Sequence, residues 1–232
     1  MKEIFLDTDN VTRFNDICAE LEDRRSLIGP SLAVVTGPAG RGKSESAKRY
    51  AVNSSAVYIP PMITTSPLTL LQEITIDLAK VRPGRMAGCL EVIQSEMNRL
   101  RRIIIIDEAD LLPMKILEML RNMNERYACP ILLIGEDGLR SRVATRRRLS
   151  SRVRRSMDFG AITQPDIVVF FRKSLEKNIE PSVASLIHRH SQGDWRPVLK
   201  IAADIERAVE ASGLKTIPED LVKAIIDEDG KR

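Results

Sequence analysis

The sequence predicts a three-layer α/β domain with a parallel sheet, followed by a small domain made only of helices. Three observations lead to this prediction. Runs typical of strands alternate with runs typical of helices up to residue 162. The fully apolar run 103–106 is typical of a strand buried on both faces, as in a parallel sheet. From residue 163 onward only helical spacing is found, so we expect an α/β domain over 1–162 and a helical lid over 163–232.

The composition is typical of a folded globular protein. The 232 residues are 43% hydrophobic and 29% charged, a length and balance that suit one large domain with a small appendage. The longest strongly apolar run is far too short to span a bilayer, and the first residues show no signal-peptide core. The three cysteines lie far apart in the sequence, and the two histidines have no acidic or cysteine cluster beside them. We therefore expect a cytoplasmic protein without membrane contacts, disulfides or a zinc site.

The first predicted elements lead toward a glycine-rich loop. Apolar residues recur at helical spacing from Val11 to Leu21, after the capping-type run Thr8–Asn10. The β-branched run 32–36 predicts the first strand of the sheet. The run 45–52 is compatible with a helix, so the loop lies between a strand and a helix.

This loop, from Gly37 to Ser44, fits the phosphate-binding pattern G-x-x-x-x-G-K-[ST] at each fixed position. Glycines allow backbone N–H groups to turn around a polyphosphate, and the N-terminus of the following helix favours the same anion. In this chemistry Lys43 reaches the β- and γ-phosphates, and the Ser44 hydroxyl binds Mg²⁺. The predicted nucleotide-contacting residues are Gly37, Pro38, Ala39, Gly40, Arg41, Gly42, Lys43, Ser44 and Glu45.

Three further elements precede the next informative stretch. Residues 56–59 predict a second strand, which Pro60–Pro61 closes. Ser66–Pro67 begins a helix with an apolar face, and another helix carries apolar residues from position 90 to 100.

The apolar strand 103–106 ends in two carboxylates, Asp107 and Glu108. The carboxyl end of a central parallel strand is where such sheets bind ligands. With a phosphate loop upstream, Asp107 is the predicted Mg²⁺ ligand and Glu108 the group that polarises the attacking water. The alternative is that Asp107 or Asp110 only caps the next helix, and the phosphate loop upstream argues against it. Asp107–Asp110 also spells a helicase signature, but the chain is too short for two motor domains.

The rest of the α/β part contains an arginine-rich segment. We predict a helix that contains Leu111, Leu117 and Leu120, a strand over 131–134, and a short edge strand over 157–161. Eight arginines lie from position 140 to 155, and a second basic cluster holds Arg99, Arg101 and Arg102. Such clusters suit phosphate backbones or are solvated faces, and charge alone leaves both interpretations open. The low aromatic content of 4% argues against binding of single strands by base stacking.

The helical part contains four predicted helices. One carries apolar residues from 167 to 175, and a second begins near Pro181. The third runs to Gly213, a residue typical of helix ends, and the last follows a capping box at 216–219.

The phosphate loop, the strand ending at Asp107–Glu108 and the helical tail together resemble an AAA+ ATPase. Two more motifs match. The segment 148–153 resembles the Ser-Arg segment that carries an arginine finger, and 193–196 resembles the lid motif that carries the sensor 2 arginine. The resemblance implies that Arg152, or its rival Arg148, reaches a γ-phosphate bound in a neighbouring subunit. It also implies that Arg196 contacts the nucleotide of its own subunit; surface roles for these arginines stay open.

The chain departs from the family at one position. The resemblance implies a polar sensor 1 residue at the end of the strand 131–134, where this sequence has Gly135 followed by Glu136. Glu136 is the nearest candidate. This departure concerns the rate of hydrolysis more than nucleotide binding.

Within this superfamily, the chain is similar to the phage ATPases that activate target DNA for transposition of the Mu type. The segments 5–11, 42–50, 105–110 and 151–153 match in order. The resemblance implies ATP and Mg²⁺ as cofactors, a homo-oligomeric filament or ring on duplex DNA in the ATP state, and DNA-stimulated ATP hydrolysis in a bacterial host cell. The partner would be a transposase, and DNA would be contacted largely without sequence preference. The implied catalytic residues are Lys43, Glu108, Arg152 and Arg196, and the candidate DNA contacts are Arg82, Arg85, Arg99, Arg101 and Arg102.

Two other functions remain open. A related ATPase could load a helicase or remodel another protein, which predicts preference for that partner and for single-stranded DNA. A nucleotide-gated binding module with little turnover is the third hypothesis, and the unusual Gly135–Glu136 pair keeps it open.

Overall fold

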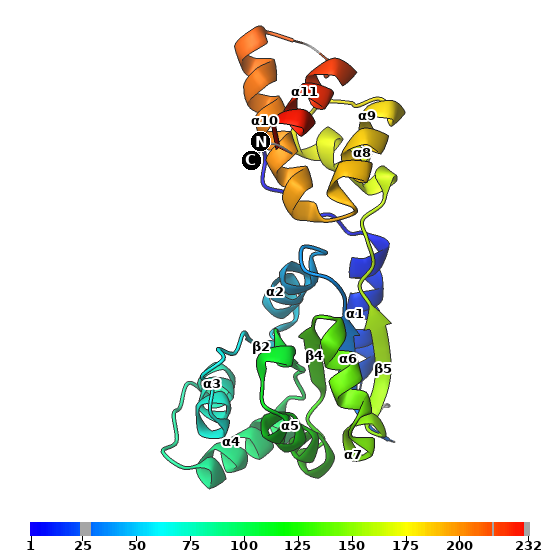
Figure 1. Ribbon diagram of the computed structural model, residues 1–232. Coiled ribbons are helices and arrows are strands. Elements are labelled where there is room, and N and C mark those ends of the chain that lie inside the picture. Colours follow the sequence, from blue (N-terminus) through cyan, green and yellow to red (C-terminus); the bar gives the residue numbers. More distant parts are fainter. Residues whose placement is uncertain (24–28, 215, 230–232) are drawn as a thin grey trace. The chain divides into compact units, whose positions relative to one another are not determined.

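The computed structural model describes residues 1–23, 29–214 and 216–229, which form two compact units (Figure 1). The sheet unit contains Thr12–Pro38 and Lys43–Phe159. The helical unit contains Met1–Val11, Ala39–Gly42 and the described part of Gly160–Arg232. The sequence predicts a domain boundary after residue 162 and assigns residues 1–11 to the α/β domain. In the structure, residues 1–11 belong to the helical unit.

The sheet unit is built on five parallel strands in the order β2-β3-β4-β1-β5. The strands are β1 (Leu32–Thr36), β2 (Val57–Ile59), β3 (Ile104–Ile106), β4 (Ile131–Gly135) and β5 (Val153–Asp158). The limits of β1 to β4 were predicted to within one residue, because β-branched apolar runs mark strands buried on both faces. The prediction of an edge strand over 157–161 was wrong in its limits, because β5 begins at Val153 and pairs with the whole of β1.

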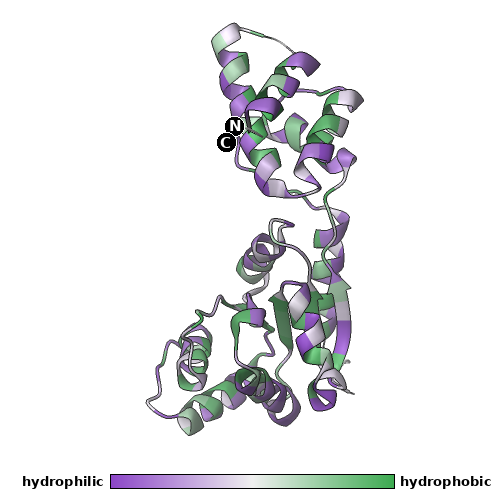
Figure 2. Ribbon diagram, in the orientation of Figure 1, coloured by the Kyte–Doolittle hydropathy of each residue, from purple (hydrophilic) through white to green (hydrophobic). Residues whose placement is uncertain are grey.

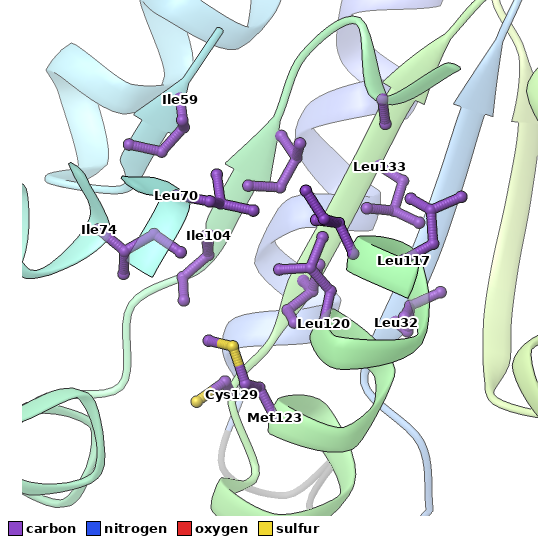
Figure 3. Packing of buried hydrophobic residues seen from close by; sticks show 14 of the residues in the cluster. Leu32, Ile59, Leu70, Ile74, Ile104, Leu117, Leu120, Met123, Cys129 and Leu133 are labelled. Carbon is purple, nitrogen blue, oxygen red and sulfur yellow. The ribbon is translucent and has the colours of Figure 1, made fainter. Parts of the chain in front are cut away.

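Side chains on the two faces of the sheet separate by alternation. Leu32, Ile104 and Leu133 belong to one buried cluster with residues of the helices that cover this face, as Figure 3 shows for Ile74, Leu117 and their neighbours. The intervening strand residues, such as Ala33 and Ile105, are also fully buried and point to the other face. A sheet covered on both faces is the middle layer of a three-layer fold.

The helices of this unit are α1 (Asp9–Glu22), α2 (Lys43–Ser54), α3 (Pro67–Ala79), α4 (Met86–Arg99), α5 (Met114–Tyr127), α6 (Asp137–Ala144) and α7 (Arg147–Ser150). The Ser66 side chain caps α3 by accepting a hydrogen bond of 3.1 Å from the Thr69 N–H. The helix predicted from Leu111 is wrong at its start. Leu111 ends a short 3₁₀ helix, Ala109–Leu111, and α5 starts only after Pro113, because proline disfavours helical conformation in the residue before it.

The helical unit contains α8 (Gln164–Ser174), α9 (Pro181–Ser191), α10 (Trp195–Ser212) and α11 (Glu219–Asp229). Each carries both hydrophobic and hydrophilic residues (Figure 2), and the apolar ones form a second core with Leu6 from the start of the chain. Lys2 and Ser174 exchange two hydrogen bonds, of 2.9 Å from the Lys2 N–H to the Ser174 carbonyl and 2.8 Å from the Ser174 hydroxyl to the Lys2 carbonyl. None of the helices in the described residues is long and apolar enough to cross a membrane.

Candidate nucleotide-binding site

The phosphate loop follows the carboxyl end of β1, and Lys43 is the first residue of α2. Gly37, Gly40 and Gly42 have positive φ angles of 152°, 74° and 100°, which favour glycine. The ammonium of Lys43 donates hydrogen bonds of 2.6 Å to the Gly37 carbonyl and 2.7 Å to the Pro38 carbonyl. The sequence thus identified the loop, its glycines and its lysine in the strand–loop–helix context that phosphate binding requires.

Four carboxylates act electrostatically on Lys43. Burial lowers the pKa of Lys43, and the negative charges of Glu136, Asp107, Asp110 and Asp137 oppose this effect. The carboxylates follow β3 and β4, whose carboxyl ends share one edge of the sheet. One buried cation surrounded by acidic side chains is an arrangement that suits a polyphosphate bound together with a metal ion.

The oxygen donors present at this edge are of the kind that Mg²⁺ prefers. Among the described residues, no three His, Cys, Asp or Glu side chains form a group that could hold a metal ion. Mg²⁺ is commonly bound by one or two protein oxygens, with phosphate oxygens and waters filling its other positions. The Ser44 hydroxyl and the Asp107 carboxylate, both predicted from sequence, are donors of this kind.

Asp107 is held by three hydrogen-bonding groups around the end of β3. It is only 3% exposed. Its Oδ1 accepts from the Glu108 N–H at 2.9 Å, and its Oδ2 accepts from the Tyr58 hydroxyl at 2.7 Å. Its own N–H donates to the Ile59 carbonyl at 2.9 Å. The backbone of Glu108 is in the left-handed region, with φ 47°, so the chain turns sharply here. Glu108 is exposed, which leaves its carboxylate accessible.

At the end of β4, the position where the family resemblance implies a polar side chain is occupied by the Asp110 carboxylate, which would have to move to admit one. A Cβ added to Gly135 would lie 2.3 Å from Oδ1 of Asp110. The same oxygen accepts a hydrogen bond of 3.2 Å from the Glu136 N–H. The polar group at this position is therefore the Asp110 carboxylate, which the sequence analysis did not single out. Glu136 as the sensor 1 residue stays a prediction.

Most of the arginine-rich segment has partners inside the sheet unit. Arg142 donates to the carbonyls of Asp110 and Leu112, and so holds the turn after Glu108. The ion pairs of the segment are Arg140–Asp158 at 2.7 Å, Arg152–Glu125 at 2.5 Å, Arg154–Glu20 at 2.9 Å and Arg155–Glu20 at 2.7 Å. Five of the eight arginines thus have partners within the sheet unit, while Arg146, Arg147 and Arg148 are exposed. The interpretation of this segment as a phosphate-binding surface stays a prediction.

Arg152 lies directly before β5, at the end of the sheet opposite to the phosphate loop. Because β1 and β5 are parallel, the start of β5 and the end of β1 are separated by the length of a strand. Arg152 thus cannot reach a phosphate in its own loop. Arg148 lies nearby in α7.

The motif around Arg196 lies at the start of α10, where Asp194 caps the helix by accepting a hydrogen bond of 2.7 Å from the Arg196 N–H. Within the helical unit, the Trp195 N–H donates to the Gly40 carbonyl at 3.0 Å. Arg41 donates through Nη1 to the Gln192 carbonyl at 2.7 Å. The tip of the phosphate loop is therefore in contact with the segment that carries Arg196.

The candidate DNA contacts differ in exposure. Arg82, Arg85 and Arg99 are exposed. Arg102 is only 13% exposed in its side chain and donates to the Leu78 carbonyl at 2.8 Å. The guanidinium nitrogens of Arg101 are buried, and this residue lines a cavity of about 200 Å³ together with Arg152. Arg99 is also ion-paired with Glu96 at 2.8 Å. Arg82, Arg85 and Arg99 are the accessible candidates.

Gly37→Ala is expected to destabilise the sheet unit by about 1–3 kcal/mol, because a Cβ here would lie 2.6 Å from the Phe159 carbonyl oxygen and φ is 152°. Urea unfolding measures this loss. Gly138→Ala in α6 is the control, since its Cβ would have no neighbour within 4 Å in the described structure, and alanine there should stabilise by up to about 1 kcal/mol. Equal stability of the two variants would contradict the close approach at Gly37.

Comparison with known proteins shows the family to which the chain belongs. A family model described as an AAA domain matches residues 27–143, half of the chain. The chain is 31% identical over 122 residues to the Mu-like prophage FluMu DNA transposition protein B of Haemophilus influenzae, covering 50% of this chain and 42% of that protein. It is 32% identical over 118 residues to the ATP-dependent target DNA activator B of Escherichia phage Mu, covering 48% and 37%.

These matches span less than half the length of either relative. Among solved structures, the ORC1 protein of Aeropyrum pernix in complex with DNA has a TM-score of 0.63 and 21% identity, covering 98% of this chain and 66% of that one. At this identity the likeness concerns the fold alone, and it confirms the predicted α/β architecture. With the family model matching half its length, this chain belongs to the AAA domain family.

Proposed function

We propose that this chain is an Mg²⁺-dependent ATPase that assembles on duplex DNA and delivers target DNA to a transposase in a bacterial host. The observation that carries the proposal is that Lys43 and Asp107 come together at one edge of the sheet, with the exposed Glu108 directly after Asp107. The transposition function is supported by the relatives named as transposition protein B and target DNA activator B.

The proposed chemistry assigns one role to each group. Lys43 exchanges its two carbonyl partners for phosphate oxygens, which keeps the buried ammonium hydrogen-bonded. Ser44 and Asp107 would hold Mg²⁺, which would neutralise charge on the phosphates. The exposed Glu108 accepts a proton from the attacking water. Arg196, beside the loop tip, contacts the nucleotide of its own subunit.

Assembly is proposed because Arg152 and Arg148 lie far from the loop of their own chain. An arginine finger supplied by a neighbour would complete the site only between subunits, so nucleotide binding and assembly would be coupled. A filament or ring on DNA would meet this requirement. The exposed Arg82, Arg85 and Arg99 are proposed to contact DNA phosphates, which gives binding with little sequence preference.

Fluorescence anisotropy with a nonspecific duplex of about 60 base pairs tests this proposal, and affinity should fall steeply with salt because phosphate contacts release counterions. The conditions are no nucleotide, ADP, and ATP with Mg²⁺. We expect tight, cooperative binding only with ATP. Unchanged, weak duplex affinity in a protein that still binds ATP would contradict the transposition function and favour a helicase loader or another partner-remodelling role.

A nucleotide-gated module with little turnover is the second candidate, and the absent side chain at Gly135 favours it. ATP turnover measured with and without DNA separates the two. DNA-stimulated turnover supports the ATPase, whereas ATP-gated DNA binding without turnover supports the module.

A further inference from the structure

Tyr58 lies in the middle of β2, and the sequence motifs do not single it out. The strands β2 and β3 are parallel neighbours, with Tyr58 paired to Ile105 and Ile59 to Ile106. This register brings the Tyr58 hydroxyl to the Asp107 carboxylate at the end of β3, where it donates a hydrogen bond of 2.7 Å to Oδ2.

The strand β2 therefore fixes Asp107 twice. The Ile59 carbonyl accepts from the Asp107 N–H at 2.9 Å, and Tyr58 binds the side chain of the same residue. The second carboxylate oxygen, Oδ1, accepts from the Glu108 N–H at 2.9 Å. With one donor on each oxygen, rotation of the carboxylate would break at least one hydrogen bond of a nearly buried charge, which is costly.

The Tyr58 hydroxyl is a donor at neutral pH, because a phenol ordinarily loses its proton only at about pH 10.

The orientation of Asp107 matters because few protein groups are available for a metal ion. The described residues contain no three-residue acidic, histidine or cysteine group for a cation. Binding would therefore depend on Ser44, Asp107 and the phosphates. Groups that orient a metal ligand through hydrogen bonds affect metal affinity strongly even without touching the metal.

We propose that Tyr58 is a positioning residue, whose hydroxyl holds Asp107 in the orientation in which it helps to bind the Mg²⁺ that accompanies ATP. The inference rests on the proposed function, because that function makes Asp107 a metal ligand.

Tyr58→Phe removes only the hydroxyl, and Tyr50→Phe is its matched control. The Tyr50 hydroxyl also donates a 2.7 Å hydrogen bond to a carboxylate, that of Glu22, away from Asp107. Binding of a fluorescent ATP analogue to the full chain is measured in EDTA and across a Mg²⁺ titration. For Tyr58→Phe we expect an unchanged affinity for the ATP analogue in EDTA. The Mg²⁺ concentration that gives half of the maximal increase in this affinity should rise roughly 10-fold. Tyr50→Phe should match the wild type.

A double-mutant cycle strengthens the test. In an Asp107→Asn background, Tyr58→Phe should cause no further rise in the Mg²⁺ midpoint, because the two residues act through one hydrogen bond. An unchanged Mg²⁺ midpoint in Tyr58→Phe would overturn the role of Tyr58 but not the proposed function. An equal loss of affinity for the ATP analogue in EDTA and in Mg²⁺ would have the same meaning. A wild-type protein whose ATP affinity does not respond to Mg²⁺ would overturn the proposed function as well.

Discussion

Glu108→Gln is expected to lower ATP turnover by about 10²–10⁴-fold and to leave ATP binding intact, because an amide cannot accept the proton of the attacking water. The change should be well tolerated by the fold. Glu108 is exposed, and its backbone hydrogen bonds to the Asp107 side chain and from the Leu111 N–H do not involve its own carboxylate. If hydrolysis releases the protein from DNA, the variant should form DNA complexes that persist.

Phosphate release measures turnover, a fluorescent ATP analogue measures binding, and anisotropy after addition of competitor DNA measures persistence. Glu136→Gln is the informative control, because Glu136 lies at the same edge of the sheet and its charge acts on Lys43. Turnover of Glu108→Gln within a few-fold of the wild type would exclude Glu108 as the base. An equal loss in Glu136→Gln would mean that the two carboxylates share the function.

The sequence sufficed where a local pattern determines the structure. The phosphate loop is a contiguous stretch whose glycines and lysine have fixed spacing, so its position between β1 and α2 could be predicted. The apolar run before Asp107 required a buried strand, and parallel strands end at one edge, which brings Asp107 and Lys43 together.

The sequence did not suffice where partners come from distant positions. Tyr58 meets Asp107 only because β2 and β3 are neighbours, and Asp110 fills the space beside Gly135 only because β3 and β4 are neighbours. Strand β5 begins at Val153, and the charged Arg154 and Arg155 interrupt the apolar pattern by which a strand is recognised. Both arginines pair with Glu20. Charge in the sequence alone could not distinguish such structural arginines from a DNA surface.

Arg152→Ala is expected to lower the ATPase rate of the assembled protein by about 10³–10⁵-fold if Arg152 is the arginine finger. Its stability should change little, because the Arg152–Glu125 ion pair is about 40% exposed on both sides (41% and 43%) and such pairs contribute about 0–1 kcal/mol. Arg148→Ala tests the rival residue, and Arg146→Ala, an exposed arginine of the same segment, is the control. Loss of rate in Arg148→Ala alone would transfer the finger role to Arg148.

A mixing experiment distinguishes a finger from a residue that acts within its own chain. Lys43→Ala subunits should be inactive because their own loop fails, but they keep Arg152. Arg152→Ala subunits should be inactive because the neighbour's finger is missing, but they keep a complete loop. Since Arg152 and the loop of its own chain lie at opposite ends of the sheet, a mixed oligomer should regain activity at interfaces where an intact Arg152 faces an intact loop. Mixtures that stay inactive while still forming oligomers would show that Arg152 does not act across the interface, and the ion pair with Glu125 would then be its main role.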